Sequence, residues 1–164
     1  MTTYCIREQI FTLGDRFHIM DETGTVCFIA EGELFSFGRK LHLYRAAGDD
    51  AIGEEVAFIE QEIVLFSRPR YRILSADSAA FTVVSEFSFF SRAYSVPERG
   101  WQITGDFFDH DYKVTQDDTT VAEVSKEWFT FGDCYTVRAE DASDALAALC
   151  AALVIDCMDE QRRN

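Results

Sequence analysis

The chain has few prolines and lacks a linker-like stretch and a signal-peptide pattern. Only two prolines occur, Pro69 and Pro97, and no Gly/Ser-rich stretch interrupts the sequence. Its 164 residues, nearly half of them apolar, are enough to bury a core without disulfides or metals, so we expect one domain over residues 1–164. The first residues lack the basic and apolar regions of a signal peptide, which predicts a cytoplasmic protein.

Motifs for metal binding, disulfide pairing and catalysis are also missing. The five cysteines form no CxxC pair, and their odd number argues against a disulfide framework or a zinc site, so buried reduced thiols are expected. The chain contains no GxSxG, HExxH or P-loop motif. We therefore predict that the protein is not an enzyme and needs no metal or cofactor.

Positive charge is scarce. The net charge of −14 argues against nucleic acid as a partner and against a wholly basic membrane-binding surface. The charge is unevenly spread, because residues 61–100 hold five arginines and four acids while the rest of the chain carries a net −15. This distribution predicts that the electrostatic potential differs between one part of the surface and the rest.

The chain does contain a repeated sequence motif, which we call the phrase. In each copy an aromatic-rich run is followed by a short polar break, and a new run then begins on a large apolar residue. Such repetition indicates one supersecondary unit built several times. The six copies occupy residues 11–17, 35–41, 65–71, 89–94, 107–112 and 129–135.

Reading each phrase as a turn predicts six hairpins. Apolar and polar side chains alternate along several of the segments, and turn clusters separate one hairpin from the next. Twelve strands exceed the size at which an open twisted sheet is stable, so a closed antiparallel β-barrel is expected. The predicted strand pairs are 4–13 with 16–21, 25–37 with 40–46, 55–66 with 70–75, 80–90 with 93–97, 101–108 with 111–116, and 120–131 with 134–139.

The carboxy-terminal segment predicts a helix over residues 143–158, with Ser143 or Asp141 as its cap. Residues 145–155 carry no polar side chain, so the helix is apolar on every side, yet it is too short to cross a bilayer. Such a helix must be surrounded by protein. A twelve-stranded barrel is too wide for its own side chains to fill, and we therefore place the helix along its centre.

These features together resemble a known family. The hairpin segments 35–41, 105–112 and 128–133, with the apolar helix that ends at 155–157, are similar to the LURP-one-related proteins, in a single-domain form. The resemblance covers essentially the whole chain. It implies the Tubby carboxy-terminal-like fold, a twelve-stranded barrel around a central helix that phospholipid scramblases share. It also implies a link to lipids, since Tubby proteins bind phosphoinositides through a basic surface, although the ligand residues of that surface cannot be assigned to positions here.

Five cations fall in the turns of three neighbouring hairpins: Arg39, Lys40, Arg68, Arg70 and Arg92. If these turns meet at one rim, they form a basic patch suited to phosphate, because arginine offers a forked donor to phosphate oxygens. The alternative is a solvated rim that Glu62 and Glu86 neutralise. An exposed aromatic cluster beside the arginines would favour membrane docking, whereas Phe35, Phe37, Phe87, Phe89, Trp128 and Phe131 are expected in the interior or at the rim.

Acids occupy the turns of the first and last hairpins, at Asp15, Asp109, Asp111 and Asp133. If they gather at one sector they are a candidate Ca²⁺ or Mg²⁺ site, but their spacing matches no EF-hand loop, and turn chemistry accounts for them without a metal. His110 stands between two of these carboxylates and is a candidate general base, but no nucleophile accompanies it. His18 and His42 follow the first apolar residue of their strands, which predicts that they face outward.

Three functions remain open. The first is a non-enzymatic binding module that recognises an anionic phospholipid headgroup or another phosphate, at or near a membrane surface, through the five cations. The second is a protein-interaction or scaffold domain with no lipid ligand. The third, scramblase-like lipid transport, is disfavoured because the chain has no long apolar terminal span.

Overall fold

The computed structural model describes residues 1–7, 16–33, 36–86 and 91–163, apart from the side chain of Asp133. Within these residues the chain forms twelve strands, one 3₁₀ turn and one α-helix. The strands are β1 (Thr2–Arg7), β2 (Arg16–Met20), β3 (Val26–Gly32), β4 (Lys40–Ala46), β5 (Ile52–Glu62), β6 (Arg70–Ser75), β7 (Phe81–Glu86), β8 (Ala93–Val96), β9 (Trp101–Asp106), β10 (Asp111–Gln116), β11 (Thr119–Phe129) and β12 (Gly132–Ala139); the 3₁₀ turn is η1 (Pro97–Arg99) and the helix is α1 (Ala142–Arg163).

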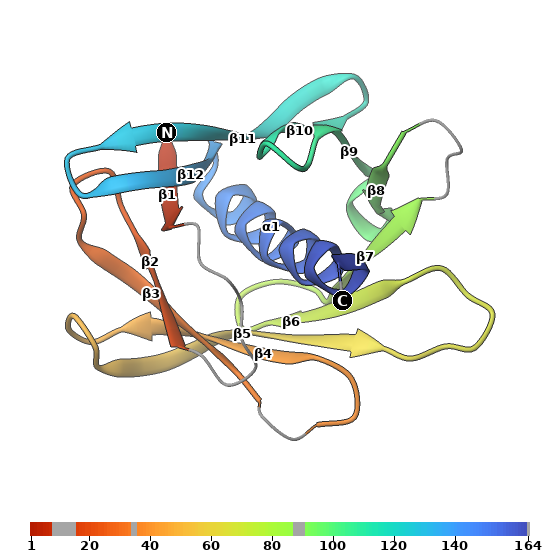
Figure 1. Cartoon of the computed structure of the whole chain (residues 1–164), viewed down its shortest axis with the longest axis horizontal. Coiled ribbons are helices and arrows are strands. Elements are labelled where there is room, and N and C mark those ends of the chain that lie inside the picture. The colour runs from red at the N-terminus through yellow and green to blue at the C-terminus, as the bar shows by residue number, and fades with distance from the viewer. Residues whose placement is uncertain (8–15, 34–35, 87–90, 164) are drawn as a thin grey trace.

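The strands form one closed barrel. Each strand pairs antiparallel with the next one along the chain, and β1 pairs with β12 to complete the circle. The helix α1 runs through the space that the strands enclose (Figure 1). The predicted fold, a closed twelve-stranded antiparallel barrel around a carboxy-terminal helix, is confirmed.

Alternation along the strands explains which side chains fill the barrel. On β4, Leu41 and Leu43 are buried while His42 between them is only partly covered. On β6, Tyr71 and Ile73 are buried while Arg72 is exposed. Successive side chains of a strand point to opposite faces, so the apolar set faces α1 and the polar set faces solvent. His42 and the corresponding His18 face outward, as predicted.

The helix is buried on all its sides over most of its length. Leu149, Leu153 and Val154 have no exposed surface, and the alanines between them bring the helix close to the strands. Asp141 caps the amino terminus, because its Oδ1 accepts hydrogen bonds from the backbone N–H groups of Ser143 and Asp144 at 2.8 and 3.2 Å. Of the two predicted caps, Asp141 is therefore the one used.

The helix and some strands differ in length from the prediction. Helix α1 continues five residues beyond Met158, because the side chains of its last turns bond to the surrounding hairpins. Strand β5 ends at Glu62, although the prediction extends it to residue 66, and β11 ends two residues early. Residues 63–66 are apolar but exposed, so they belong to the loop that connects β5 to β6. The predicted strand residues 8–13 and 87–90 lie outside the described part of the chain.

Connections between strands alternate between the two ends of the barrel. The β3–β4, β5–β6 and β7–β8 loops lie at the end where α1 finishes, which we call the mouth. In Figure 1 the β5–β6 loop projects to the right, near the carboxy terminus, and the β4–β5 connection lies on the left. The connections at the end opposite the mouth are acidic and carry Asp21, Glu22, Asp49, Asp50, Asp77, Asp117, Asp118, Glu140 and Asp141.

Candidate functional site

The mouth is lined by the residue that restarts each repeated phrase. On β6, β8, β10 and β12 this residue is a tyrosine: Tyr71, Tyr94, Tyr112 and Tyr135. All four are buried inside the barrel around the last turns of α1. Burial raises the pKa of Tyr94 to about 12 and raises the pKa of the other three above its ordinary value, so all four hydroxyls remain protonated donors.

Polar side chains of α1 accept hydrogen bonds from these tyrosines. Tyr71 donates to Gln161 at 3.2 Å, Tyr94 to Asp159 at 3.5 Å, and Tyr135 to Asp156. The Tyr112 hydroxyl is also buried and has no hydrogen-bond partner among the described residues. Because buried polar groups must pair, these bonds fix the position of the helix along an otherwise apolar barrel.

His110 belongs to this same arrangement. Its Nε2 lies 3.0 Å from Oδ1 of Asp156, and its ring stacks on Tyr135 with centroids 4.1 Å apart. The histidine thus joins the β9–β10 turn to the helix. Sequence spacing pointed to Asp109 and Asp111 as its partners and missed Asp156, which is 46 residues away. Asp109 instead takes part in a turn, where its backbone N–H bonds to Asp106.

Two of the five predicted ligand-binding cations pair with the helix. Arg39 lies 2.9 Å from Glu160, and Arg92 lies 3.0 Å from Asp159. The Asp159 side chain is only 8% exposed, so Arg92 supplies the positive charge that a buried carboxylate requires. These two arginines tie the β3–β4 and β7–β8 hairpins to α1.

The other three predicted cations point away from the helix. Arg68 pairs with Glu86, as the alternative of a neutralised rim expects, and Arg70 donates to the Ser67 hydroxyl. Within the described residues no carboxylate lies within ion-pair distance of Lys40, Arg70 or the neighbouring Arg72. Glu60 and Glu62 stand opposite these cations across the sheet, as Lys40↔Glu60, Glu60↔Arg72 and Glu62↔Arg70.

The three hairpins are adjacent at the mouth. Gln61 on β5 and Arg39 exchange two hydrogen bonds, of 2.8 and 3.1 Å, which join the β3–β4 and β5–β6 hairpins. The backbone N–H of Ser85 on β7 bonds to the carbonyl of Pro69 at 2.9 Å, which joins the β5–β6 and β7–β8 hairpins. The three hairpins therefore lie side by side at the mouth, while a binding patch formed by their five cations stays a prediction.

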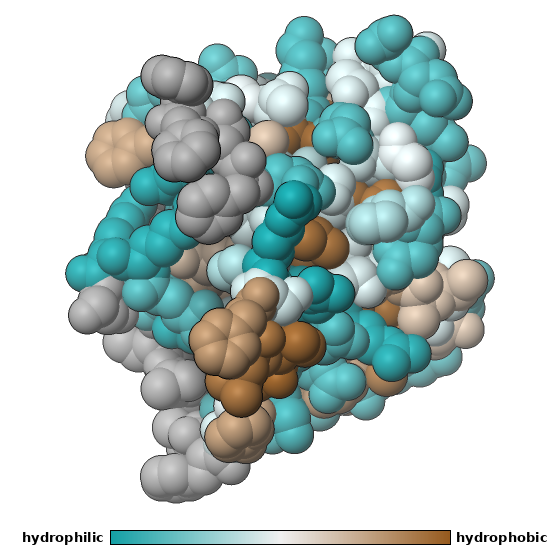
Figure 2. All heavy atoms as spheres, turned by 90° about the vertical axis from the view of Figure 1, so that its right-hand side faces the viewer, coloured by the Kyte–Doolittle hydropathy of each residue, from teal (hydrophilic) through white to brown (hydrophobic). Residues whose placement is uncertain are grey.

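Large apolar side chains are exposed on the loops of the mouth. Phe37 of the β3–β4 loop is 83% exposed, and Leu65 and Phe66 of the β5–β6 loop are 82% and fully exposed. Figure 2 shows apolar side chains gathered on this side of the molecule. Alternation is broken at residues 63–66, where four apolar residues follow one another, and this break was the signal that sequence reasoning overlooked.

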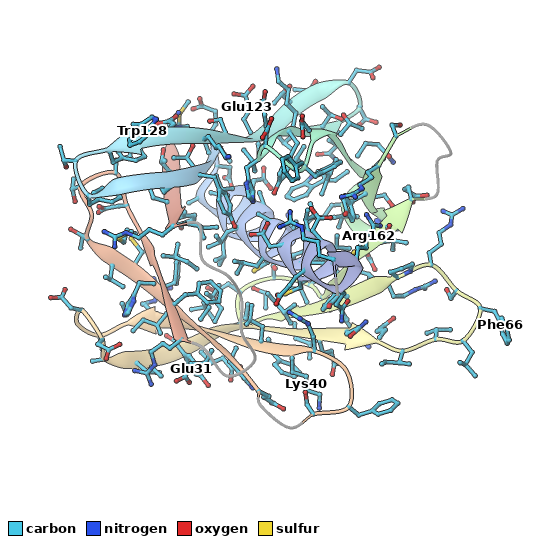
Figure 3. The ribbon with its side chains drawn as sticks, viewed as in Figure 1. Glu31, Lys40, Phe66, Glu123, Trp128 and Arg162 are labelled. Carbon is cyan, nitrogen blue, oxygen red and sulfur yellow. The ribbon has the colours of Figure 1, made fainter. Side chains whose placement is uncertain are left out.

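Of the remaining aromatic positions, Phe131 is half-buried against the cluster of Cys5, Met20 and Cys134, one is exposed at the rim, and the others lie outside the described residues. Trp128, at the β11–β12 tip, is 84% exposed, so of the two expected places it takes the rim. Figure 3 shows it on the opposite side of the molecule from Phe66. Phe35, Phe87, Phe89 and Asp15 lie outside the described residues. In the described part of the chain, no three His, Cys, Asp or Glu side chains are arranged to hold a metal ion.

The fold and the mouth define a class of protein, an antiparallel twelve-stranded barrel that encloses an apolar helix. The chain belongs to the LURP-one-related family, whose model matches residues 2–156. It is 27% identical over 151 residues to YxjI of Bacillus subtilis (strain 168), which is described as an uncharacterized protein. The aligned region covers 92% of this chain and 90% of YxjI. The X-ray structure of the Arabidopsis thaliana protein AT5G01750 superposes with a TM-score of 0.61 at 17% identity, over 96% of this chain and 90% of that one, and so shares the fold.

One pair of contacts outside the mouth leads to a pH prediction. His42 lies between Glu33 and Glu55, at 2.8 and 2.7 Å. Burial lowers the pKa of His42, but the bonds to the two carboxylates outweigh it and raise the pKa above its ordinary value. The stability that these bonds supply is therefore complete below the ordinary histidine pKa and is lost as the pH rises through the raised value.

We expect His42→Gln to lower the free energy of unfolding more at about pH 6 than at about pH 9, because histidine is charged only at the lower pH. Urea unfolding of both proteins at the two pH values measures the difference. A loss of stability that is the same at both values would show that the charged form of His42 does not contribute.

Proposed function

We propose that this protein is a non-enzymatic binding module that recognises the phosphate groups of an anionic phospholipid surface with the cations of its mouth. The observation that carries the proposal is the position of Lys40 and Arg70. They are the first residues of β4 and β6 on adjacent hairpins, and no carboxylate of the described chain lies within ion-pair distance of either. Arg68 and Arg72 flank them, while Arg39 and Arg92 hold the helix in place.

The overall negative charge does not prevent this mode of binding. Many acids lie in the connections at the opposite end of the barrel, although the β9–β10 turn at the mouth carries Asp109, and salt screens charges over about 8 Å at physiological ionic strength. Each cation close to an anionic leaflet contributes about 1 kcal/mol, so the cations of the mouth together supply about 3 to 4 kcal/mol. Electrostatics then also orients the barrel, with its mouth toward the lipid.

Family membership is compatible with this function. The description of YxjI names no ligand, so the proposal rests on the chain's own mouth. The geometry does not favour His110 as a general base, because its ring contacts Asp156 and Tyr135 inside the barrel. Within the described residues, no helix is both long and apolar enough to cross a membrane.

Charge reversal at the mouth tests the proposal. We expect the double variant Lys40→Glu/Arg70→Glu to lower the partitioning onto phosphatidylglycerol-containing vesicles about tenfold or more, measured by co-sedimentation. The matched control is Lys113→Glu/Lys126→Glu, which makes the same change in net charge on exposed positions of β10 and β11.

Arg92 is left intact in this design, because a glutamate there would face the buried Asp159 and destabilise the fold. Equal losses in the two double variants would mean that net charge, and not the mouth, governs binding. No partitioning of the wild-type protein would overturn the proposal, and capture of a protein partner that survives the mouth substitutions would support the scaffold function instead.

A further inference from the structure

The loop between β5 and β6 carries four consecutive apolar side chains that the core does not use. Ile63 and Val64 are each about half exposed, and Leu65 and Phe66 are almost completely exposed. The strands that flank the loop bury their own inward residues, Ile59 and Tyr71. The loop residues are therefore an addition to the core and need a separate explanation.

The backbone of this loop holds its apolar tip outward. Phe66 has a φ of 59°, the left-handed conformation that bulky residues rarely adopt. Because its ring is fully exposed, no packing within the described chain compensates for this conformation. Figure 3 shows the Phe66 side chain at the outermost edge of the molecule, pointing away from the barrel. Strained positions of this kind cluster at binding and active sites.

A second loop enlarges the apolar surface. A Cβ placed on Gly38 would lie 3.3 Å from Cδ1 of Ile63, so the β3–β4 and β5–β6 loops lie against each other. Phe37, next to that glycine, is exposed beside them. Phe37 and residues 63–66 together form what we call the apolar tip. Contiguous exposed apolar patches on soluble proteins usually mark interaction sites.

The charges behind the apolar tip identify the kind of partner. Neither segment, 36–41 or 63–73, contains an acidic residue, and cations follow the apolar residues of both: Lys40 in the first, where Arg39 is held by Glu160, and Arg68, Arg70 and Arg72 in the second. Apolar side chains at a projecting end with cations one layer behind match the depth profile of an anionic bilayer, hydrocarbon first and phosphate above it.

We infer that the apolar tip inserts into the acyl-chain boundary of an anionic membrane, while the cations behind it contact the headgroup phosphates. This inference rests on the proposed function and adds to it the element that enters the bilayer. It predicts that the two contributions are separable: salt weakens the contact made by the cations and leaves the contact made by the tip.

Tryptophan fluorescence can follow the tip directly. The chain has two tryptophans, of which Trp101 is buried and Trp128 lies exposed on the far side. In the variant Phe66→Trp/Trp128→Phe, the new indole is the exposed reporter. We expect vesicles that contain phosphatidylglycerol to shift its emission to the blue, and brominated acyl chains to quench it. The wild-type protein is the matched control, because Trp128 should neither shift nor be quenched.

The second measurement uses a variant in which the apolar tip is made polar. Leu65→Ser/Phe66→Asn removes the exposed apolar groups, and asparagine tolerates the left-handed conformation of residue 66. We expect vesicle partitioning to fall about tenfold or more with an unchanged melting temperature, because only groups outside the core are altered. The remaining binding should become more sensitive to salt than that of the wild type.

The outcomes separate the two proposals. If the charge-reversed mouth loses binding while the polar tip binds like the wild type and the indole at position 66 stays unshifted, the headgroup function stands and insertion is wrong. If the indole shifts equally on neutral and anionic vesicles, insertion stands and headgroup selectivity is wrong. A blue shift that appears without lipid and grows with protein concentration would assign the apolar tip to a second copy of the chain and overturn insertion.

Discussion

Truncating Leu153 to alanine is expected to lower the free energy of unfolding by about 3 kcal/mol. Leu153 lies in the middle of α1 and has no exposed surface, with strands on every side. Its removal leaves a cavity that the barrel cannot close, because the strands are bonded in a continuous circle. Alanine is a better helix former than leucine, so the loss measures packing alone.

The control for this prediction is Leu74→Ala on β6. It removes the same atoms from a side chain that is 40% exposed on the outer face, so we expect a loss of about 1 kcal/mol or less. Denaturant unfolding measures both variants. Equal losses at the two positions would contradict the placement of α1 in the centre of the barrel.

The substitution Gly105→Ala is expected to cost about 4 kcal/mol, through a backbone clash together with strain. Gly105 sits on β9 opposite Tyr112 with a φ of 142°, which favours glycine. A Cβ there would lie 2.5 Å from the carbonyl oxygen of Asp111 and 2.6 Å from the Cα of Tyr112. Because both atoms belong to the backbone, only a shift of the β9–β10 hairpin could relieve the contact.

Gly132→Ala separates the clash from the strain. Gly132 has a φ of 119°, but a Cβ there would meet nothing within 4 Å. We therefore expect a loss of about 2 kcal/mol from the unfavourable conformation alone. Thermal unfolding of the two variants provides the comparison. A smaller effect at Gly105 than at Gly132 would show that β10 does not pack against β9 as described.

The stability of the mouth bears on its proposed role. Arg39, Arg92, Tyr71 and His110 come from four separate hairpins or turns, and each contacts a side chain in the last turns of α1. The helix therefore acts as a common support for the loops of the mouth. A rigid support holds the cations and the apolar tip in one arrangement, which reduces the entropy lost when they meet a surface.

The fold could be predicted from the sequence because its signals are local. Each phrase ends where a strand restarts on a residue that fills the barrel, such as Leu41 or Tyr71, and the all-apolar segment 145–155 admits only an enclosed helix. The boundaries were harder to place. Residues 63–66 are as apolar as the middle of β5, and nothing in their composition distinguishes a loop from a strand except the broken alternation.

The candidate site could be predicted only in part. The adjacency of the three hairpins follows from the alternation of connections in a meander, and their common role in binding stays a prediction. The pairing of Arg39 with Glu160 and of Arg92 with Asp159 spans 121 and 67 residues, so no local spacing reveals it. The last turn of α1 reads as a polar tail in the sequence, because its bonding partners come from strands far away along the chain.

The most direct test of the central claim is co-sedimentation of the intact wild-type protein with vesicles of phosphatidylcholine alone and with vesicles that also contain phosphatidylglycerol, at low and at high salt. The mouth predicts strong binding to the anionic vesicles at low salt, weaker binding at high salt, and little binding to the neutral vesicles. Equal partitioning onto the two kinds of vesicle, or none onto either, would contradict recognition of an anionic phospholipid surface by this barrel.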